Sequence, residues 1–335
     1  MIKVAINGFG RIGRPTFKRI LKAHPDLEVV AINDLTDPQT LAHLLKYDSL
    51  YGIYEKGVKA KENTILIDGK EVKVLSEPDP EKLPWDKLEI DIVLECTGRF
   101  TALEDAKKHL LAGAKKVIIS ANSKTEEVPH FVLGVNEENF DPQKDNVVAM
   151  GSCTTNCVAP VLKVLNDNFG VKKGFFTTVH SYTNNQRLLD LPHKDLRRAR
   201  AAALNIIPTT SGAAKAVARI IPKLKGKFTG IALRVPTPVV SITDIICQLE
   251  KATIAEEVNY TFKKASQTER LKGILGIEDQ PLVSSDYKGN SFSAIVDASL
   301  TMVFGDLVKI VAWYDNEWAY ACRLAEFAEY IGKKL

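Results

Sequence analysis

One cysteine near the middle of the chain is placed for nucleophilic chemistry. Residues 152–157 read Ser-Cys-Thr-Thr-Asn-Cys, and they follow a short apolar stretch at 146–149. The apolar spacing after them, up to Phe169, is typical of a helix. Cys153 is therefore expected at a strand-to-helix corner, beside the unpaired N–H groups of the first helical turn. That position favours the thiolate, the form of cysteine that attacks carbonyl carbons.

A histidine downstream is a candidate base for this thiol. His180 follows the apolar residues 175–179, which predict a strand that ends beside it. A thiol nucleophile is activated by an adjacent general base, and histidine is the side chain most often used for proton transfer. The residue types alone leave an alternative open, because a single Cys and a single His can also be a buried small hydrophobe and a satisfied polar residue.

A glycine-rich turn near the N-terminus predicts a dinucleotide site. Residues 8–13 read Gly-Phe-Gly-Arg-Ile-Gly, between a predicted strand at 3–7 and a predicted helix at 15–23. The glycines of this run are Gly8, Gly10 and Gly13. Asp34 ends the next predicted strand, where a carboxylate accepts hydrogen bonds from the ribose hydroxyls and repels a 2′-phosphate. The pattern therefore indicates NAD rather than NADP.

Several cations and hydroxyls downstream of Cys153 suit an anionic substrate. Arg234 lies inside the apolar segment 229–235, where an unpaired charge is costly, so it needs a carboxylate or a bound phosphate as partner. Ser211 and Gly212 open a predicted helix, whose N-terminus suits an anion. Residues 181–205 form a long, arginine-rich segment without a clean strand or helix pattern, and such loops are usually functional.

The pattern of elements predicts two kinds of domain. Up to about residue 150, strands and helices alternate, which is typical of a parallel α/β sheet with crossover helices. After Cys153 the strands are longer and alternating, which indicates a mostly antiparallel sheet in an α+β domain. Within the first part, the Asp-Gly turn of a hairpin at 65–74 suits type I′ geometry, and residues 101–104 have the spacing of a helix capping box. Within the second, residues 294–304 predict one continuous strand.

Composition narrows the class of protein. The chain has 335 residues, 45% of them hydrophobic, and a formal net charge of +4 that is too small to indicate nucleic-acid binding. Its five cysteines lack metal-ligand spacing, so no metal is predicted, and they fit a reducing cytoplasm. No apolar run reaches membrane-spanning length, and the N-terminus enters a strand without a signal-peptide pattern, so we expect no membrane association.

Two segments carry a specific resemblance. Residues 152–157 resemble the active-site stretch of phosphorylating glyceraldehyde-3-phosphate dehydrogenases, and residues 177–183, Thr-Thr-Val-His-Ser-Tyr-Thr, resemble their histidine stretch. The similarity runs from Asn7 to Glu317. It implies a Rossmann dinucleotide-binding domain at 1–151, onto which a C-terminal helix at 316–335 packs, and an α+β catalytic domain at 152–315.

The resemblance implies a role for each matching residue. Cys153 is the nucleophile and His180 the base. The implied dinucleotide contacts are Gly8, Gly10, Arg11, Ile12, Gly13, Asp34, Ser120 and Asn316. The positions matching the site of the substrate's C3 phosphate are Thr183 and Arg234. Those matching the site of the attacking inorganic phosphate are Ser152, Thr154, Arg198, Ser211 and Gly212. Ser211 replaces a usual threonine and keeps its hydroxyl, whereas Pro78 replaces an arginine of many relatives and removes any side-chain contact there.

The implied assembly is a homotetramer that uses NAD. Leu191 and Pro192 resemble the pair found in NAD-preferring members, in a loop that a neighbouring subunit extends towards the adenosine ribose. The implied reaction converts glyceraldehyde 3-phosphate, NAD and inorganic phosphate into 1,3-bisphosphoglycerate through a thiohemiacetal and a thioester on Cys153. Two alternatives are an erythrose-4-phosphate dehydrogenase, which usually hydrolyses its thioester, and a non-catalytic NAD-responsive binding protein.

Overall fold

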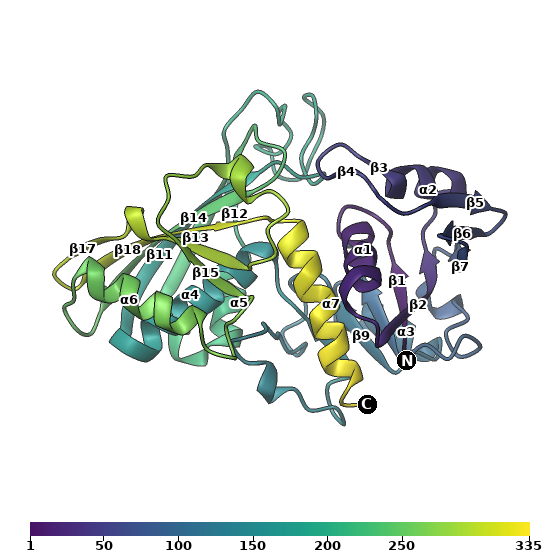
Figure 1. The fold of residues 1–335 in the computed structure, drawn as a ribbon, viewed down its shortest axis with the longest axis horizontal. Coiled ribbons are helices and arrows are strands. Elements are labelled where there is room, and N and C mark those ends of the chain that lie inside the picture. Colours follow the sequence, from purple (N-terminus) through teal and green to yellow (C-terminus); the bar gives the residue numbers. More distant parts are fainter. The chain divides into compact units, whose positions relative to one another are not determined.

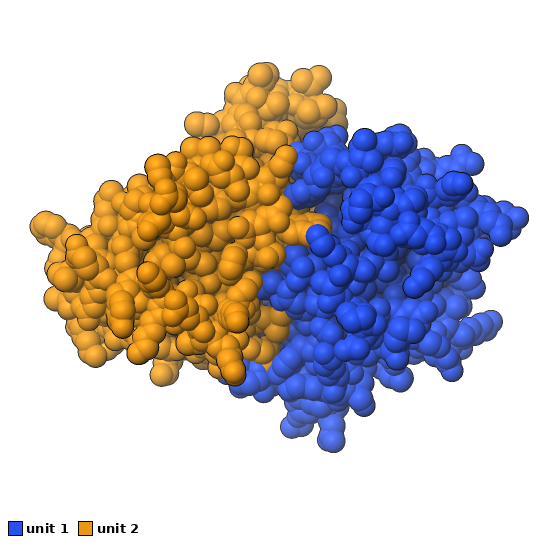
Figure 2. Space-filling model, viewed as in Figure 1, with its two compact units in different colours: residues 1–131, 138–151, 321–335 blue, residues 132–137, 152–320 orange.

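The computed structural model describes all 335 residues, and they form two compact units. Unit 1 comprises residues 1–131, 138–151 and 321–335, and unit 2 comprises residues 132–137 and 152–320 (Figure 2). The chain therefore leaves unit 1, builds unit 2 and ends in unit 1. None of its helices combines the length and the apolar character needed to cross a bilayer.

Unit 1 is built on an eight-stranded sheet in the order β10-β9-β8-β1-β2-β7-β6-β5 (Figure 1). The strands are β1 (Ile2–Asn7), β2 (Leu27–Asn33), β5 (Val58–Lys61), β6 (Thr64–Ile67), β7 (Lys70–Leu75), β8 (Ile92–Glu95), β9 (Lys116–Ile119) and β10 (Val147–Ala149). All neighbours from β10 to β7 are parallel, and β7, β6 and β5 continue antiparallel. Every residue of β8, β9 and β10 is buried, as expected for parallel strands covered on both faces.

Four helices accompany this sheet. They are α1 (Gly13–Ala23), α2 (Pro38–Lys46), α3 (Leu103–Leu111) and α7 (Trp318–Gly332), and a small pair, β3 (Tyr47–Asp48) and β4 (Gly52–Ile53), follows α2. The part of α7 in unit 1 is tied to α1 and the residue that follows it, because Glu326 pairs with Arg19 at 3.2 Å and Glu329 with His24 at 2.8 Å. Leu324, Phe327 and Ile331 of α7 are fully buried, so this helix completes the core of unit 1.

Unit 2 is built on a second sheet, in the order β12-β13-β11-β14-β18-β16-β15 with β17 beside β18. The strands are β11 (Val171–Ser181), β12 (Ile207–Thr210), β13 (Phe228–Val235), β14 (Ser241–Leu249), β15 (Leu275–Glu278), β16 (Ala294–Asp297), β17 (Met302–Phe304) and β18 (Leu307–Tyr314). Only β11–β13 and β15–β16 are parallel, so the predicted mostly antiparallel sheet is confirmed. The helices are α4 (Cys153–Phe169), α5 (Ala213–Ile220) and α6 (Ala255–Ser266).

Two local predictions are wrong. The expected capping box at 101–104 is absent: Ala102 is the N-cap of α3 and makes no side-chain cap, while the Leu103 N–H donates to Thr125 Oγ1 at 2.9 Å. The expected strand 294–304 is interrupted by a 3₁₀ turn at 298–300, where Asp297 accepts from Ser299 Oγ at 2.7 Å. The hairpin turn is confirmed, because Asp68 and Gly69 both have positive φ, of 49° and 87°. Residues 182–206 contain no helix or strand, as predicted for the long loop.

Candidate active site

Cys153 is the first residue of α4, at a capped helix N-terminus. Gly151 precedes the helix with φ 68°, a left-handed conformation that suits glycine and turns the chain sharply. Ser152 is the N-cap: its Oγ accepts from the Thr155 N–H at 3.1 Å, and its own N–H donates to Thr155 Oγ1 at 3.2 Å. The predicted strand-to-helix placement of Cys153 is therefore confirmed. The N–H groups of the first turn that the cap leaves unpaired face the same end of the helix as the thiol.

His180 lies within hydrogen-bonding reach of the thiol. Its Nε2 is 3.3 Å from Cys153 Sγ, and its Nδ1 is 2.7 Å from the carbonyl oxygen of Ser181. A carbonyl can only accept, so we assign the proton of the neutral ring to Nδ1. This tautomer leaves the lone pair of Nε2 facing the sulfur, which is the arrangement a base requires.

The two groups are neutral in this resting geometry. Burial, reinforced by the nearby Arg234 charge, lowers the pKa of His180 from its ordinary 6.5 to about 3. Burial also raises the pKa of the Cys153 thiol, although the Arg234 charge and the Thr154 N–H act in the opposite direction. The helix N-terminus acts in the predicted direction, because the N–H groups of Cys153 and Thr154 lower the pKa of the thiol, but burial is the larger influence.

Arg234 supplies an unbalanced positive charge beside the pair. It is aligned with His180 in the register of the parallel strands β11 and β13. Its Nη1 lies 2.8 Å from His180 Nδ1 and 3.1 Å from the Ser181 carbonyl, and it donates to the carbonyl since Nδ1 already carries a proton. No carboxylate of the chain pairs with it, and its buried Nε has no hydrogen-bond partner. The sequence predicted either a carboxylate or a bound phosphate as the partner of Arg234, and without a carboxylate the bound anion remains.

A buried tyrosine joins the elements under the site. Tyr314 Oη lies 3.0 Å from Thr154 Oγ1 and 2.8 Å from Thr178 Oγ1, which links β18 to α4 and β11. Burial raises the pKa of Tyr314, so its hydroxyl stays protonated. Sequence reasoning missed this residue. Its signal is a polar tip at the end of an otherwise apolar strand, directly before Asp315 and Asn316.

A second residue missed from the sequence, Ser241, orients Asn316. The Ser241 hydroxyl accepts from the Ser181 N–H at 3.1 Å and lies 3.1 Å from Asn316 Oδ1, to which it donates. The amide nitrogen of Asn316 is thereby directed away from Ser241. The Ser241 hydroxyl thus binds both the backbone that follows His180 and the side chain of Asn316.

The other predicted anion ligands have partners of their own. Arg198 Nε donates to Thr209 Oγ1 at 2.9 Å and lies 3.5 Å from Asp195, so its charge is partly balanced. Ser211 Oγ accepts from the Ala213 N–H at 3.3 Å beside Gly212, the N-cap of α5. The Thr183 N–H donates to Gln186 at 3.2 Å. The structure brings Thr154 and Arg234 to the cysteine–histidine pair, whereas the convergence of Thr183, Arg198, Ser211 and Gly212 on one substrate stays a prediction.

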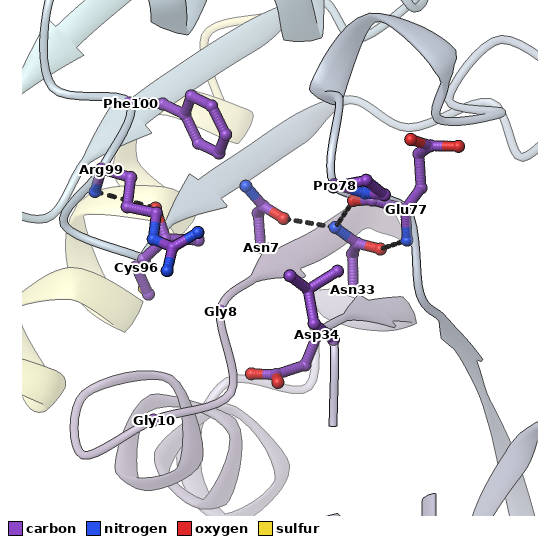
Figure 3. Close-up of a pocket in the computed structure, with 12 residues that line it drawn as sticks. Asn7, Gly8, Gly10, Asn33, Asp34, Glu77, Pro78, Cys96, Arg99 and Phe100 are labelled. Carbon is purple, nitrogen blue, oxygen red and sulfur yellow. Dashed lines mark hydrogen bonds between the residues drawn. The ribbon is translucent and has the colours of Figure 1, made fainter. Parts of the chain in front are cut away.

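Unit 1 contains a pocket of about 280 Å³ at the glycine-rich turn (Figure 3). It is lined by Asn7, Gly8, Gly10, Asn33, Asp34, Leu35, Glu77, Pro78, Cys96, Thr97, Arg99 and Phe100. Gly8 has φ 93°, and a Cβ there would lie 2.7 Å from the Thr97 nitrogen. A Cβ on Gly13 would lie 2.2 Å from the Gly8 carbonyl oxygen. A Cβ on Gly10 would meet no protein atom within 4 Å, so the chain is open to a ligand at this position.

Asp34 is held at the pocket by backbone donors. Its Oδ2 accepts from the Phe9 N–H at 2.8 Å and its Oδ1 from the Thr36 N–H at 3.0 Å. Each oxygen keeps a further lone pair for a ribose hydroxyl. Helix α1 begins after Ile12 without a side-chain cap or an acidic residue in its first turn, so no carboxylate of that turn competes with a phosphate at this helix N-terminus. The pocket therefore fits a dinucleotide.

Five predicted cofactor residues are not among those that line this pocket: Arg11, Ile12, Gly13, Ser120 and Asn316. The side chain of Arg11 is engaged by Asp48 at 2.7 Å, so a cofactor contact from Arg11 would come from its backbone. The Ser120 N–H donates to the Glu95 carbonyl at 3.0 Å, and Ser120 is not among the lining residues. Asn316 belongs to unit 2. Their contacts to the cofactor stay predictions.

Comparison with known proteins gives matches over both units. A family model described as the glyceraldehyde 3-phosphate dehydrogenase NAD binding domain matches residues 2–103, and one described as the C-terminal domain of the same enzyme matches residues 152–316. A glyceraldehyde-3-phosphate dehydrogenase of Geobacillus stearothermophilus is 57% identical over 334 residues, which is 99% of each chain. Enzymes of the same name from Streptomyces coelicolor and Trichormus variabilis are 54% and 56% identical, over 100% of this chain and 99% of theirs.

Proposed function

The chain belongs to the glyceraldehyde-3-phosphate dehydrogenase family, and we propose that Cys153 and His180 perform its reaction, the NAD-dependent oxidation of glyceraldehyde 3-phosphate to 1,3-bisphosphoglycerate with inorganic phosphate. The observation that carries these roles is the 3.3 Å approach of His180 Nε2 to Cys153 Sγ, with the Nε2 lone pair directed at the thiol. A neutral base facing a neutral thiol can accept its proton at the moment of attack.

The first half of the reaction needs a nucleophile and a proton acceptor. The Cys153 sulfur adds to the aldehyde carbon as its proton passes to His180, and His180 returns this proton to the aldehyde oxygen to give the thiohemiacetal. His180 then takes the hydroxyl proton as the carbon is oxidised to the thioester, and NAD, when bound, accepts the hydride. The Cys153 N–H at the start of α4 and His180 stabilise the developing oxyanion.

The second half needs an attacking phosphate held near the thioester. We assign this anion to Ser152, Thr154, Arg198, Ser211 and Gly212. We assign the C3 phosphate of the substrate to Thr183 and Arg234, because Arg234 carries a charge that no protein carboxylate balances. The oxygen of the attacking phosphate displaces the Cys153 sulfur, which restores the thiolate and then the resting pair.

Cofactor binding is assigned to unit 1, where the pocket fits NAD. The Asp34 carboxylate accepts from ribose hydroxyls and repels the 2′-phosphate of NADP. The N–H groups at the start of α1, around Gly10, Arg11 and Ile12, receive the pyrophosphate. Ser120 and Asn316 complete the set, with the Asn316 amide nitrogen available for the nicotinamide carboxamide.

We assign a homotetramer to the enzyme, supported by its exposed apolar residues. The long loop exposes six large aliphatic side chains, which is unusual for a surface that stays in water. They are Leu188, Leu189, Leu191, Leu196, Leu204 and Ile206. Leu191, next to Pro192, is 58% exposed and so is available to a neighbouring subunit. All five cysteines are free thiols, which fits the proposed cytoplasmic location.

One assay tests the proposed reaction. NAD reduction by glyceraldehyde 3-phosphate should be rapid and should depend on inorganic phosphate. Rapid turnover without phosphate, faster still with erythrose 4-phosphate, would favour the hydrolysing relative. Absence of NAD reduction with intact NAD binding would favour the non-catalytic alternative.

A further inference from the structure

Three buried polar side chains form a row at the pocket in unit 1. Asn7, Asn33 and Glu95 are the last residues of the adjacent strands β1, β2 and β8, and the register pairs Asn7 with each of the others. Side chains paired in this way point to the same face of a sheet. Asn7 is 1% exposed, Asn33 5% and Glu95 1%, so their polar atoms depend on protein partners.

Every group around the Glu95 carboxylate is a hydrogen-bond donor. Oε2 accepts from Asn7 Nδ2 at 2.6 Å and from His109 Nε2 at 3.2 Å. Oε1 accepts from the Thr97 N–H at 2.8 Å and from the Thr97 hydroxyl. The direction of the histidine contact is fixed, because Trp85 Nε1, which can only donate, lies 3.0 Å from His109 Nδ1. The His109 proton is therefore on Nε2 and points at Glu95.

Glu95 fixes the orientation of the Asn7 side-chain amide, and Asn7 in turn fixes that of the Asn33 amide. Since Asn7 Nδ2 donates to Glu95, Asn7 Oδ1 faces Asn33 and accepts from its Nδ2 at 2.7 Å. Asn33 Nδ2 also donates to the Glu77 carbonyl at 2.9 Å, and Asn33 Oδ1 accepts from the Glu77 N–H at 2.9 Å. These contacts are visible in Figure 3. The Asn33 amide thus holds both backbone groups of Glu77, which lines the pocket beside Pro78.

We propose that Glu95, through Asn7 and Asn33, is a positioning residue that fixes the Glu77–Pro78 wall of the pocket against the adenosine half of NAD. The inference rests on the proposed function, which assigns this pocket to NAD, and on Asp34, the ribose acceptor on the same pocket. Glu95 is not one of the lining residues and acts without touching the cofactor.

The variant Glu95→Gln shows why an acceptor-only side chain is needed. Its amide nitrogen would face donors on whichever side it lay. If it faces Asn7, the Asn7 amide can turn over, because its Oδ1 would then accept from the new amide and, 3.4 Å away, from His109 Nε2. The turned Asn7 presents its nitrogen to Asn33, which must turn in response.

The mismatch of hydrogen-bonding groups in Glu95→Gln finally falls on the bonds between Asn33 and the Glu77 backbone. A turned Asn33 amide opposes its oxygen to the Glu77 carbonyl and its nitrogen to the Glu77 N–H, so both bonds to Glu77 become repulsive. The Glu77 segment can then move into solvent, which is the least costly place to relieve the mismatch because Ser76 and Pro78, on either side of the half-buried Glu77, are exposed. The fold is kept while the wall of the pocket is lost.

The test measures cofactor binding and turnover separately in the full-length enzyme. Glu95→Gln should raise the Kd for NAD and for ADP-ribose by calorimetry, and the KM for NAD, by roughly tenfold. Its kcat and its KM for glyceraldehyde 3-phosphate should stay within about twofold of wild type. Glu104→Gln is the matched control, because the Glu104 side chain on α3 is 83% exposed, and it should bind NAD as wild type does.

A double variant distinguishes positioning from general damage. Asn33→Asp alone should weaken NAD binding, since its carboxylate would face the Asn7 oxygen. Combined with Glu95→Gln, the same carboxylate accepts from the turned Asn7 and from the Glu77 N–H, so the double variant should bind NAD more tightly than Glu95→Gln. The proposal would be overturned if the losses of NAD affinity in the two single variants simply added in the double variant. It would also be overturned if Glu95→Gln had the wild-type Kd for NAD, or if its kcat fell as much as its NAD affinity.

Two controls separate the possible failures. A wild-type enzyme that does not bind NAD would overturn the proposed function itself, whereas a wild-type enzyme that binds NAD alongside an unaffected Glu95→Gln would overturn only the role of Glu95. If Glu95→Gln does not fold, Asn33→Asp tests the same row of hydrogen bonds, because it should also weaken NAD binding. A raised KM for NAD at constant kcat supports the proposal, and unchanged constants overturn it.

Discussion

His180 and Arg234 are aligned in register on two parallel strands, and the guanidinium of Arg234 lies 2.8 Å from Nδ1 of the imidazole. A buried imidazole next to a cation resists taking up a proton, and burial together with this charge lowers the pKa of His180 to about 3. At neutral pH the ring is therefore an unprotonated base. The same cation stabilises the thiolate that forms when Cys153 gives up its proton.

Arg234→Leu should weaken turnover of the phosphorylated substrate. Loss of hydrogen bonds from a charged donor costs about 1.5–3 kcal/mol, which corresponds to roughly a 10- to 100-fold fall in kcat/KM for glyceraldehyde 3-phosphate. The discriminating measurement is the same constant for unphosphorylated glyceraldehyde, which has no phosphate to lose and should be less affected. An equal fall for both aldehydes would contradict the assignment of Arg234 to the C3 phosphate.

Cys153 should be the first thiol alkylated. Stoichiometric iodoacetamide should label it and remove activity in proportion, because burial raises the pKa of Cys96 and Cys247 to about 12 and that of Cys157 further. Since burial also raises the Cys153 pKa, alkylation of the ligand-free enzyme should accelerate with rising pH beyond about 8.5, the value of an ordinary thiol. Peptide mass spectrometry across pH 7–10 checks both points, and activity lost with another cysteine labelled would refute the assignment.

His180→Asn should slow the formation of the thioester. General-base catalysis is worth about 10²-fold or more, and asparagine cannot take the proton of the thiol. The rate in the variant should rise with pH, because only thiolate formed by exchange with solvent reacts. A stopped-flow burst of NADH in the first turnover measures this step directly. A wild-type burst rate with a wild-type pH dependence would show that His180 is not the base.

Replacing Asp34 by alanine should weaken NAD binding and relax cofactor choice. Bonds to a charged acceptor are worth roughly 1.5–3 kcal/mol, and removal of the carboxylate also ends its repulsion of a 2′-phosphate. The ratio of kcat/KM for NAD to that for NADP should fall, and fall further when Leu191 and Pro192 are also changed. Asp34→Asn is the matched control for the pocket, since its oxygen can still accept from the Phe9 N–H. Equal use of both cofactors by the wild-type enzyme would refute the interpretation of Asp34.

The local sequence was sufficient to predict elements whose apolar spacing is clear. The helix after Ser152 and the strand before His180 were predicted from apolar spacing, and both are present. The capping box at residue 101 failed because a distant hydroxyl took the role of the Thr101 side chain: Thr125 Oγ1 accepts from the Leu103 N–H at 2.9 Å, and Ala102 became the N-cap.

The remaining features depend on contacts between distant segments. Trp313 Nε1 donates to Asp297 at 3.1 Å and fixes the turn that divides the predicted strand 294–304. Tyr314 and Ser241 lie at the site because of the register in which their strands pair, and a single sequence does not specify that register. The helix terminus lowers the pKa of the Cys153 thiol as predicted, but the local sequence did not show the burial that raises it.

The return of the chain to unit 1 sets the order in which the protein is completed during synthesis. Residues 321–335 leave the ribosome after unit 2, yet they supply the buried side chains of Leu324, Phe327 and Ile331 to unit 1. Domains generally fold as their residues emerge, N-terminal segments first. Here the unit that begins first is completed only after unit 2, so a nascent chain carries an incomplete nucleotide-binding unit with exposed apolar surface until residues 321–335 have been made. Truncation at Tyr320 would leave it permanently in that condition.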